Sequence, residues 1–374
     1  MTTHRLRRRA ALLLAMALCG CNPQAPAPVE SDLAVLAQGA SGYAQAEPGV
    51  RLAFPRDHGS HPDFRIEWWY LTANLEDEQG QPHGLQWTLF RYAVRPPAQA
   101  EPGTPWQSPQ LFMAHLGLTW PTGHAAFQRY ARGGEHNGVA QAGARAAPFA
   151  AWLDDWSLAS TGPDWLPLRL QARQGPFGAE LDLEGRGPLV LQGQQGFSQK
   201  HPEGGGSFYY SQPFLAVSGA LRVDGEAVKV TGQAWLDREW SSQFLQPDQA
   251  GWDWFAMHLD SGEKLMLFRL RTRGDGEDYR HGVLIAPDGG KRSLDPAQIR
   301  FEVLGETTVA RRLLPLHWRI GLPEIDRSLE VTAVRPDQWM DVDFPYWEGA
   351  VTVRGAGPAN RGRGYLELTG YAPQ

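Results

Sequence analysis

From residue 51 onward, short runs of β-forming residues alternate with turn residues, and this alternation constrains the fold more than any other feature of the sequence. Runs such as Ile66–Leu75 and Trp252–Leu259 are rich in branched and aromatic side chains, whereas helical periodicity is scarce. Turn pairs such as Asp224-Gly225 connect neighbouring runs. More than a dozen strands of this length exceed one small barrel, so we predict an all-β chain with two β-barrels or β-sandwiches.

Several of these strands carry apolar or aromatic side chains on both faces. Residues two apart on a strand share a face, so Trp235, Asp237 and Glu239 point the same way. Glu67 shares a face with Trp69 by the same rule. Because both faces are apolar or aromatic, we expect one face of such strands to fill a core and the other to line a cavity, and we expect many of the 15 Trp on these faces.

Composition and motifs exclude several function classes. The formal net charge of −6 disfavours a nucleic-acid partner, which favours a basic patch. Two cysteines make neither a disulfide scaffold nor a Cys-rich zinc site. His58 and His61 are close in sequence, but no HExxH follows them, so we predict no metal and no cofactor. The absence of a G-x-S-x-G elbow disfavours a serine hydrolase.

The first twenty residues are typical of a secretion signal. Four arginines between residues 5 and 9 precede an apolar run, Ala10–Leu18, that is too short to span a bilayer. The run ends in Leu18-Cys19-Gly20-Cys21, which resembles a bacterial lipobox with Cys21 as the lipid-modified residue. An ordinary secretion signal with a coincidental cysteine is the alternative. We expect residues 21–50, rich in Pro, Ala and Gln, to be a flexible tether.

A lipid-modified Cys21 predicts a bacterial envelope protein that faces the periplasm. Asn22 follows the cysteine, whereas lipoproteins that stay in the inner membrane usually carry Asp there. The outer membrane is therefore the favoured location.

Six segments together resemble one known family. They are His61–Leu75, Gln86–Arg91, Phe208–Ser211, Gly232–Ser241, Gly251–Phe255 and Gly364–Tyr371. Their order and content resemble the lipocalin-like AttH and carotenoid 1,2-hydratase (hydroxyneurosporene synthase) family, and this chain is similar to a bacterial lipoprotein member. The resemblance implies two consecutive lipocalin-like (calycin) β-barrel or sandwich domains packed together, which we place at residues 51–243 and 244–374.

The resemblance leaves the activity open, because the family spans hydratases and secreted bacterial proteins. Many bacterial members are encoded beside ABC-transporter components, which makes such components candidate partners. The lipoprotein signal places this chain away from pigment synthesis, and so disfavours a carotenoid substrate.

Hydration of an isolated alkene requires a carboxylic acid kept protonated by burial and aromatic faces near the cation. The resemblance implies an Asp in the segment Trp235–Ser241 as this acid, which makes Asp237 the first catalytic candidate, with Glu239 and Glu67 beside it. Alternatively, Asp237 pairs with Arg91 or Arg238 and locks the domains together, and Glu67 caps a domain contact. The candidate ligand-binding residues are Trp69, Tyr70, Arg91, His115, Tyr210, Trp235, Trp252, Trp254, His258 and Tyr346.

These residues support two main hypotheses. The first is a lipid-anchored protein that binds a hydrophobic or amphipathic small molecule in an aromatic-lined β-barrel cavity, with an ABC transporter as a candidate partner. The second is a hydratase or isomerase acting on an isoprenoid or similar apolar substrate. An envelope scaffold without a pocket is a third alternative. Convergence of Glu67, Asp237 and Glu239 on one pocket would favour the second.

Overall fold

The computed structural model describes residues 40–99, 108–133 and 141–374. Every regular element in these ranges is a β-strand or a one-turn 3-10 helix, so the predicted all-β fold is confirmed. Within the same ranges, no helix is long and apolar enough to cross a membrane. Cys21 and the signal segment 1–20 lie outside the described residues, so the lipid anchor and the envelope location stay predictions.

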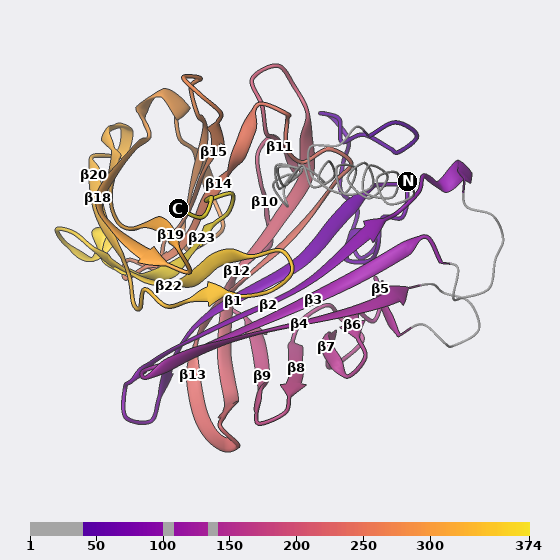
Figure 1. Ribbon diagram of the computed structural model, residues 1–374, viewed down its shortest axis with the longest axis horizontal. Helices are drawn as coiled ribbons and strands as arrows, with labels where there is room; N and C mark the ends of the chain where they lie inside the picture. The colour runs from indigo at the N-terminus through magenta and orange to yellow at the C-terminus, as the bar shows by residue number, and fades with distance from the viewer. Residues whose placement is uncertain (1–39, 100–107, 134–140) are drawn as a thin grey trace, which may run out of the picture. The chain divides into compact units, whose positions relative to one another are not determined.

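The first sheet holds strands β1 to β13 and closes into a barrel, because β12 pairs with β13 on one side and with β9 on the other (Figure 1). Its strands are β1 (Ile66–Asp77), β2 (Pro82–Ala93), β3 (Gln110–Trp120), β4 (Gly123–Gly133), β5 (Ala142–Arg145), β6 (Ala150–Leu153), β7 (Trp156–Ser160), β8 (Leu168–Gln174), β9 (Phe177–Gly185), β10 (Val190–Leu191), β11 (Phe197–Gln199), β12 (Gly206–Val223) and β13 (Glu226–Ser241).

The second sheet runs in the order β17-β16-β15-β14-β23-β22-β20-β19-β18, with β21 beside β22, and curls without closing. Its strands are β14 (Gln249–Leu259), β15 (Lys264–Thr272), β16 (Tyr279–Ile285), β17 (Lys291–Ser293), β18 (Arg300–Val309), β19 (Arg312–Leu322), β20 (Arg327–Ala333), β21 (Trp339–Met340), β22 (Tyr346–Arg354) and β23 (Gly362–Leu368). The 3-10 helices are η1 (Arg56–His58), η2 (Pro97–Gln99), η4 (Pro296–Gln298), η5 (Pro323–Ile325) and η6 (Pro358–Asn360).

Each sheet has its own apolar core, and a third cluster lies between the sheets. Alternate residues of β1, such as Trp69 and Leu71, fill the barrel interior. The intervening residue Tyr70 packs with Trp254 and Phe268 of the second sheet. Strands β22 and β23 contact β2 and β1, which brings the outer face of the barrel against the second sheet.

The two sheets belong to one compact unit, so the predicted division at residues 51–243 and 244–374 stays a prediction. Hydrogen bonds to the folded domain already begin before residue 51, within residues 21–50, which were predicted to be a flexible tether. Tyr43 donates its hydroxyl to the Ala93 carbonyl at 2.8 Å, and the Ala44 amide donates to the Asp63 carbonyl at 2.9 Å. The first bond fastens the segment to the end of β2, and the second fastens it to the loop before β1.

Candidate functional site

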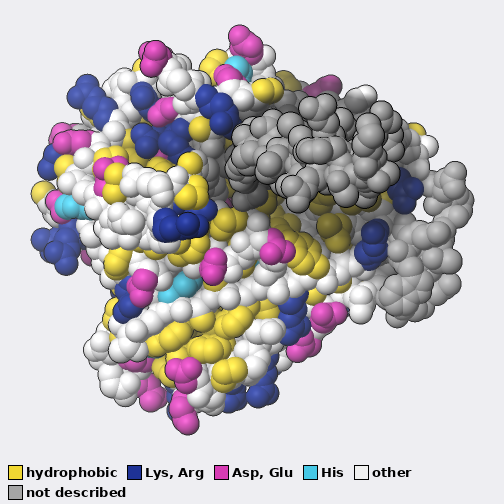
Figure 2. Space-filling model, viewed as in Figure 1, with side chains coloured by type: hydrophobic (Ala, Val, Ile, Leu, Met, Phe, Trp, Pro, Cys, Tyr) yellow, Lys and Arg dark blue, Asp and Glu magenta, His cyan; other side chains and the backbone are white. Residues whose placement is uncertain are grey.

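A cavity of about 400 Å³ lies between the outer face of the barrel and the second sheet. This volume suits a drug-sized ligand, and the lining is mainly apolar and aromatic. On the face shown in Figure 2, hydrophobic side chains gather over strands β1–β3. The aromatic lining residues are Trp68, Tyr70, Phe90, Tyr92, Tyr130, Tyr209, Phe244, Trp252, Trp254, Phe268, Phe344 and Tyr346.

Strand register arranges the barrel side of this cavity in rows, because directly paired residues of antiparallel strands point to the same side. From β12 to β4, one row contains Ser211, Asp237, Tyr70, Thr88, His115 and Gln128. The next row on the same side contains Tyr209, Glu239, Trp68, Phe90, Met113 and Tyr130, all of which line the cavity. A polar row thus runs beside an aromatic row.

Asp237 is a buried carboxyl that accepts hydrogen bonds from neutral groups. Tyr209 Oη and Trp235 Nε1 each donate to it at 2.7 Å, and Ser211 Oγ donates as well. Burial raises the pKa of Asp237 to about 7, although these donors act in the opposite direction, and nearby Glu239 adds to the rise. The cavity therefore holds a carboxylic acid that keeps its proton close to neutral pH.

Glu239 has a cation as partner. Lys200 Nζ lies 2.8 Å from its carboxylate, and Ser207 Oγ donates to it. The Lys200 ammonium also lies 4.5 Å from the centroid of the Phe268 ring. Both side chains are almost fully buried, and their opposite charges cancel. The ion pair therefore adds a polar patch with no net charge to the cavity wall.

The second sheet contributes a further acid. Glu367 lines the cavity, and burial raises its pKa to about 8, against a hydrogen bond from Trp252 that lowers it. Its neighbour on β22, Glu348, accepts a hydrogen bond from the Tyr70 hydroxyl across the two sheets. Burial raises the pKa of Glu348 well above its ordinary value. Protonated carboxyl groups thus line the cavity from both sheets, Asp237 from the first and Glu367 from the second.

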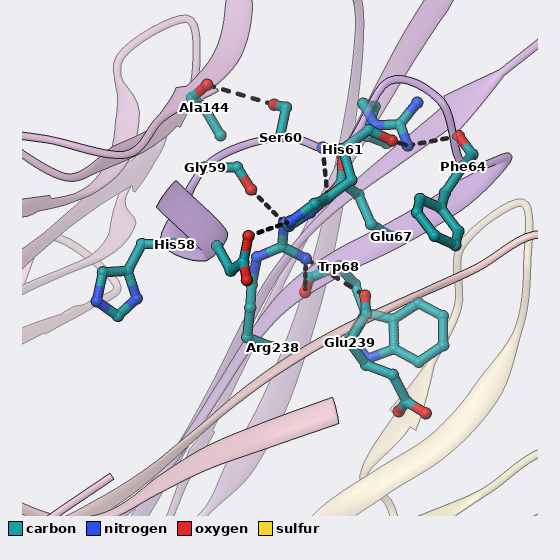
Figure 3. A network of polar contacts seen from close by, with 12 residues as sticks. His58, Gly59, Ser60, His61, Phe64, Glu67, Trp68, Ala144, Arg238 and Glu239 are labelled. Carbon is teal, nitrogen blue, oxygen red and sulfur yellow. Dashed lines mark hydrogen bonds and ion pairs between the residues drawn. The ribbon is translucent and has the colours of Figure 1, made fainter. Parts of the chain in front are cut away.

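Glu67 lies in a different environment, the ion network of Figure 3. Arg91 Nε and Arg238 Nη2 both donate to its carboxylate, and the His61 amide donates at 2.9 Å. Burial alone would raise the pKa of Glu67, but the two guanidinium groups hold it well below its usual range. Glu67 is not among the residues that line the cavity, so we assign it a structural role in place of a catalytic one.

The AttH-like family matches residues 45–371 of this sequence. The chain belongs to the AttH-like family. A Nitrosomonas europaea protein assigned to AttH shares 37% identity and a TM-score of 0.77, over 88% of this chain and 100% of the other. Kievitone hydratase from Nectria haematococca shares the fold, with a TM-score of 0.63 and 13% identity over 89% of this chain and 98% of its own. A comparison with curated proteins finds no match.

In this AttH-like chain, six predicted ligand-binding residues line the cavity: Tyr70, Arg91, His115, Trp252, Trp254 and Tyr346. Four others lie elsewhere. Trp69 donates to the His58 carbonyl, and Tyr210 bonds to His58 Nδ1 at 2.7 Å. Trp235 lies behind Asp237 and donates to it, and His258 contacts the Pro213 carbonyl at 3.0 Å.

The sequence analysis placed the cavity inside a β-barrel, and this prediction is wrong. The barrel interior is filled by leucines, alanines and tryptophans such as Trp87, and the open space lies on its outer face. The alternative pairing of Asp237 with Arg91 or Arg238 is likewise not seen, because both arginines are bound to Glu67.

The prediction missed many of the apolar and aromatic lining residues, and it also missed two charged ones, Glu367 and Lys200. Glu367 stands in the motif Gly364–Tyr371, where a lone acid on an apolar strand was the available signal. Lys200 follows the short strand β11 and precedes a Gly-rich turn, and no sequence pattern marks it. Among the described residues, no group of three or more His, Cys, Asp and Glu side chains is placed to hold a metal ion.

Proposed function

We propose that this AttH-like protein is an acid-catalysed hydratase or isomerase of a neutral, apolar alkene, with Asp237 as the proton donor. One observation carries the proposal: a buried carboxyl that keeps its proton near neutral pH lines an apolar, aromatic cavity. Kievitone hydratase, whose fold this chain shares, is a hydratase by its name.

In the proposed reaction, the Asp237 proton passes to one alkene carbon and leaves a cation on its neighbour. The aromatic faces of Trp68, Trp252 and Trp254 stabilise that cation. Water then adds to the cation and returns a proton to the Asp237 carboxylate, which gives an alcohol. Loss of a neighbouring C–H proton to the same carboxylate gives an isomerised alkene instead. Either route regenerates the acid.

A carrier of hydrophobic small molecules is the second candidate, favoured by the volume and apolar lining of the same cavity. Together with the lipid anchor proposed at Cys21, it would serve at the envelope, with ABC-transporter components as proposed partners. A carrier has no need of a protonated acid, whereas the proposed enzyme depends on one. Asp237 therefore separates the two candidates.

The test uses farnesol, a neutral isoprenoid alcohol with trisubstituted alkenes, in deuterated buffer. We expect deuterium to enter the carbon skeleton, detected by mass spectrometry, together with a hydrated or isomerised product. Asp237→Asn should lower the rate of this uptake roughly 100- to 10,000-fold, the usual range for removing a general acid. Binding, followed by quenching of tryptophan fluorescence, should persist.

The matched control is Asp182→Asn, which removes an exposed carboxyl paired with Arg169 on the barrel exterior. Its rate of deuterium uptake should equal that of the unmodified protein. Farnesol that binds but returns without deuterium contradicts the enzyme and supports the carrier. Farnesol that does not bind contradicts both candidates for isoprenoid ligands.

A further inference from the structure

His115 and Tyr346 form a buried pair that joins the two sheets at the cavity wall. His115 lies on β3 of the barrel and Tyr346 on β22, and the Tyr346 hydroxyl is 2.9 Å from His115 Nδ1. Both residues line the cavity. The proposed reaction at Asp237 does not use this pair.

The hydrogen-bond network fixes where the protons of this pair lie. The Asp343 amide contacts Gln128 Oε1 at 3.1 Å, and because an amide N–H only donates, that side-chain atom must be the oxygen. His115 Nε2, 3.2 Å from the same oxygen, must therefore carry a proton and donate it. Burial lowers the pKa of His115 to about 4, so the ring is neutral and Nδ1 carries no proton.

The Tyr346 hydroxyl must then donate its single proton to His115 Nδ1. Gln86 Nε2 donates to the Tyr346 oxygen at 3.2 Å, which occupies one of its two lone pairs. Burial raises the pKa of Tyr346 well above its ordinary value, with Glu348 and Glu367 nearby, so the hydroxyl stays protonated. Toward the cavity, the Tyr346 oxygen can only accept a hydrogen bond.

The pair is too far from Asp237 to act on the same two carbon atoms. Asp237, Tyr70, Thr88 and His115 are successive partners across four adjacent strands. At the usual strand spacing, the backbones of Asp237 and His115 are about 14 Å apart. A ligand that contacts both ends of this row therefore extends over several carbon–carbon bonds.

Resting on the proposed function for the position of the alkene, we propose that Tyr346, oriented by His115, is a specificity subsite for a ligand hydroxyl. The substrate class is an elongated, neutral molecule with an alkene at Asp237 and a hydroxyl, alcoholic or phenolic, at the far end. His115 is a positioning residue: by accepting the Tyr346 proton, it makes the subsite prefer an O–H donor over an ether or a ketone.

The experiment compares farnesol with farnesyl methyl ether, which has the same chain but no hydroxyl proton. Dissociation constants are measured from quenching of tryptophan fluorescence. The unmodified protein should bind farnesol roughly 3- to 10-fold more tightly than the ether, as one neutral hydrogen bond allows. In Tyr346→Phe this ratio should fall to about one.

His115→Leu tests the orienting role. With no acceptor at Nδ1, the Tyr346 hydroxyl is released to donate to the ether oxygen, so the ether should bind more tightly than it does to the unmodified protein. A His115 that only supports the fold would instead weaken both ligands equally. Tyr279→Phe is the matched control, since Tyr279 is half-buried on β16 and does not line the cavity, and it should keep the preference for farnesol.

Equal binding of farnesol and its ether by the unmodified protein overturns the hydroxyl subsite, as does a preference that survives Tyr346→Phe. Neither result depends on turnover. A preference for farnesol without deuterium uptake would keep the subsite and reject the proposed enzyme. Deuterium uptake without a preference for farnesol over its ether would support the proposed enzyme and reject the hydroxyl subsite.

Discussion

Glu67 and Asp237 are two buried carboxyl groups on the directly paired strands β1 and β13. Glu67 is ionised, whereas Asp237 keeps its proton close to neutral pH. Glu67 is 0% exposed and Asp237 is 3% exposed, so burial does not distinguish them. Their partners do. Two guanidinium groups donate to Glu67, whereas the donors to Asp237 within the described part of the chain are the neutral groups of Ser211, Tyr209 and Trp235.

The difference separates a structural acid from a chemical one. A carboxylate enclosed by cations keeps its negative charge and joins β1 to β2 and β13. A carboxyl enclosed by neutral donors keeps its proton, and it lines the cavity where that proton is available. The cations thus mark the group that holds the fold, and their absence marks the group that is suited to acid chemistry.

The largest expected effect on stability comes from Glu67→Gln. This change leaves the charges of Arg91 and Arg238 buried without a counter-charge, which typically costs about 3–5 kcal/mol. Urea unfolding at pH 7 should detect the loss. Because the pKa of Glu67 is depressed in the fold, its contribution is present above its unfolded pKa near 4.5 and is lost as the pH falls below that value. The variant and the unmodified protein should therefore converge in acid.

Glu302→Gln is the control for this variant. Glu302 pairs with Arg319 at 2.9 Å, but both side chains are about half exposed, and such surface pairs contribute at most about 1 kcal/mol. An equally small loss for Glu67→Gln would show that its network does not hold the sheet together.

Asp237→Asn should change the free energy of unfolding in the opposite direction and stabilise the fold as the pH rises. The pKa of Asp237 rises from 3.8 to about 7 in the fold, so the folded state resists an ionisation that the unfolded chain undergoes freely. The unmodified protein loses stability on this account as the pH rises from about 4 to 7, by up to about 4 kcal/mol. The Asn variant lacks this loss, so its relative stability should grow over that interval and level off above it.

Urea unfolding of both proteins across pH 4 to 8 measures the difference, in which titrating groups remote from Asp237 cancel. A stability difference that stays constant across this range would mean that the pKa of Asp237 is not raised in the fold, so that the carboxyl is ionised at neutral pH. Relative stability of the Asn variant that falls as the pH rises would indicate an unrecognised cation beside Asp237.

The sequence predicted the shared faces along strands but not what those faces contact. Alternation placed Trp235, Asp237 and Glu239 on one side of a strand, and the last two do line the cavity. Alternation alone does not say whether a face points into a barrel or out of it, because both faces of β1 are apolar. The cavity was therefore expected inside a barrel, whereas it lies outside.

The pairing register between neighbouring strands was the second feature that the sequence did not reveal. Arg91 was recognised as a partner for an acid, but the sequence left open which acid. The pairing of β1 with β2 puts Arg91 directly opposite Glu67, and so removes it from Asp237. Such pairings, like the position of Lys200 beside Glu239, depend on contacts between segments far apart in the chain. They cannot be deduced from one strand at a time.

The smallest expected effect is on the pH midpoint of deuterium uptake, when the nearby charge of Glu239 is removed. Glu239 contributes to the raised pKa of Asp237, but burial is the larger cause, so removing the charge should change little. The double variant Glu239→Gln with Lys200→Met replaces the ion pair by neutral side chains of similar size and leaves neither charge unpaired. The pH midpoint of deuterium uptake should then move by less than about one unit. A larger downward shift would show that Glu239 and not burial keeps the proton on Asp237. In that case the contrast with Glu67 would be one of charge sign alone, a carboxyl beside an anion against a carboxyl between two cations.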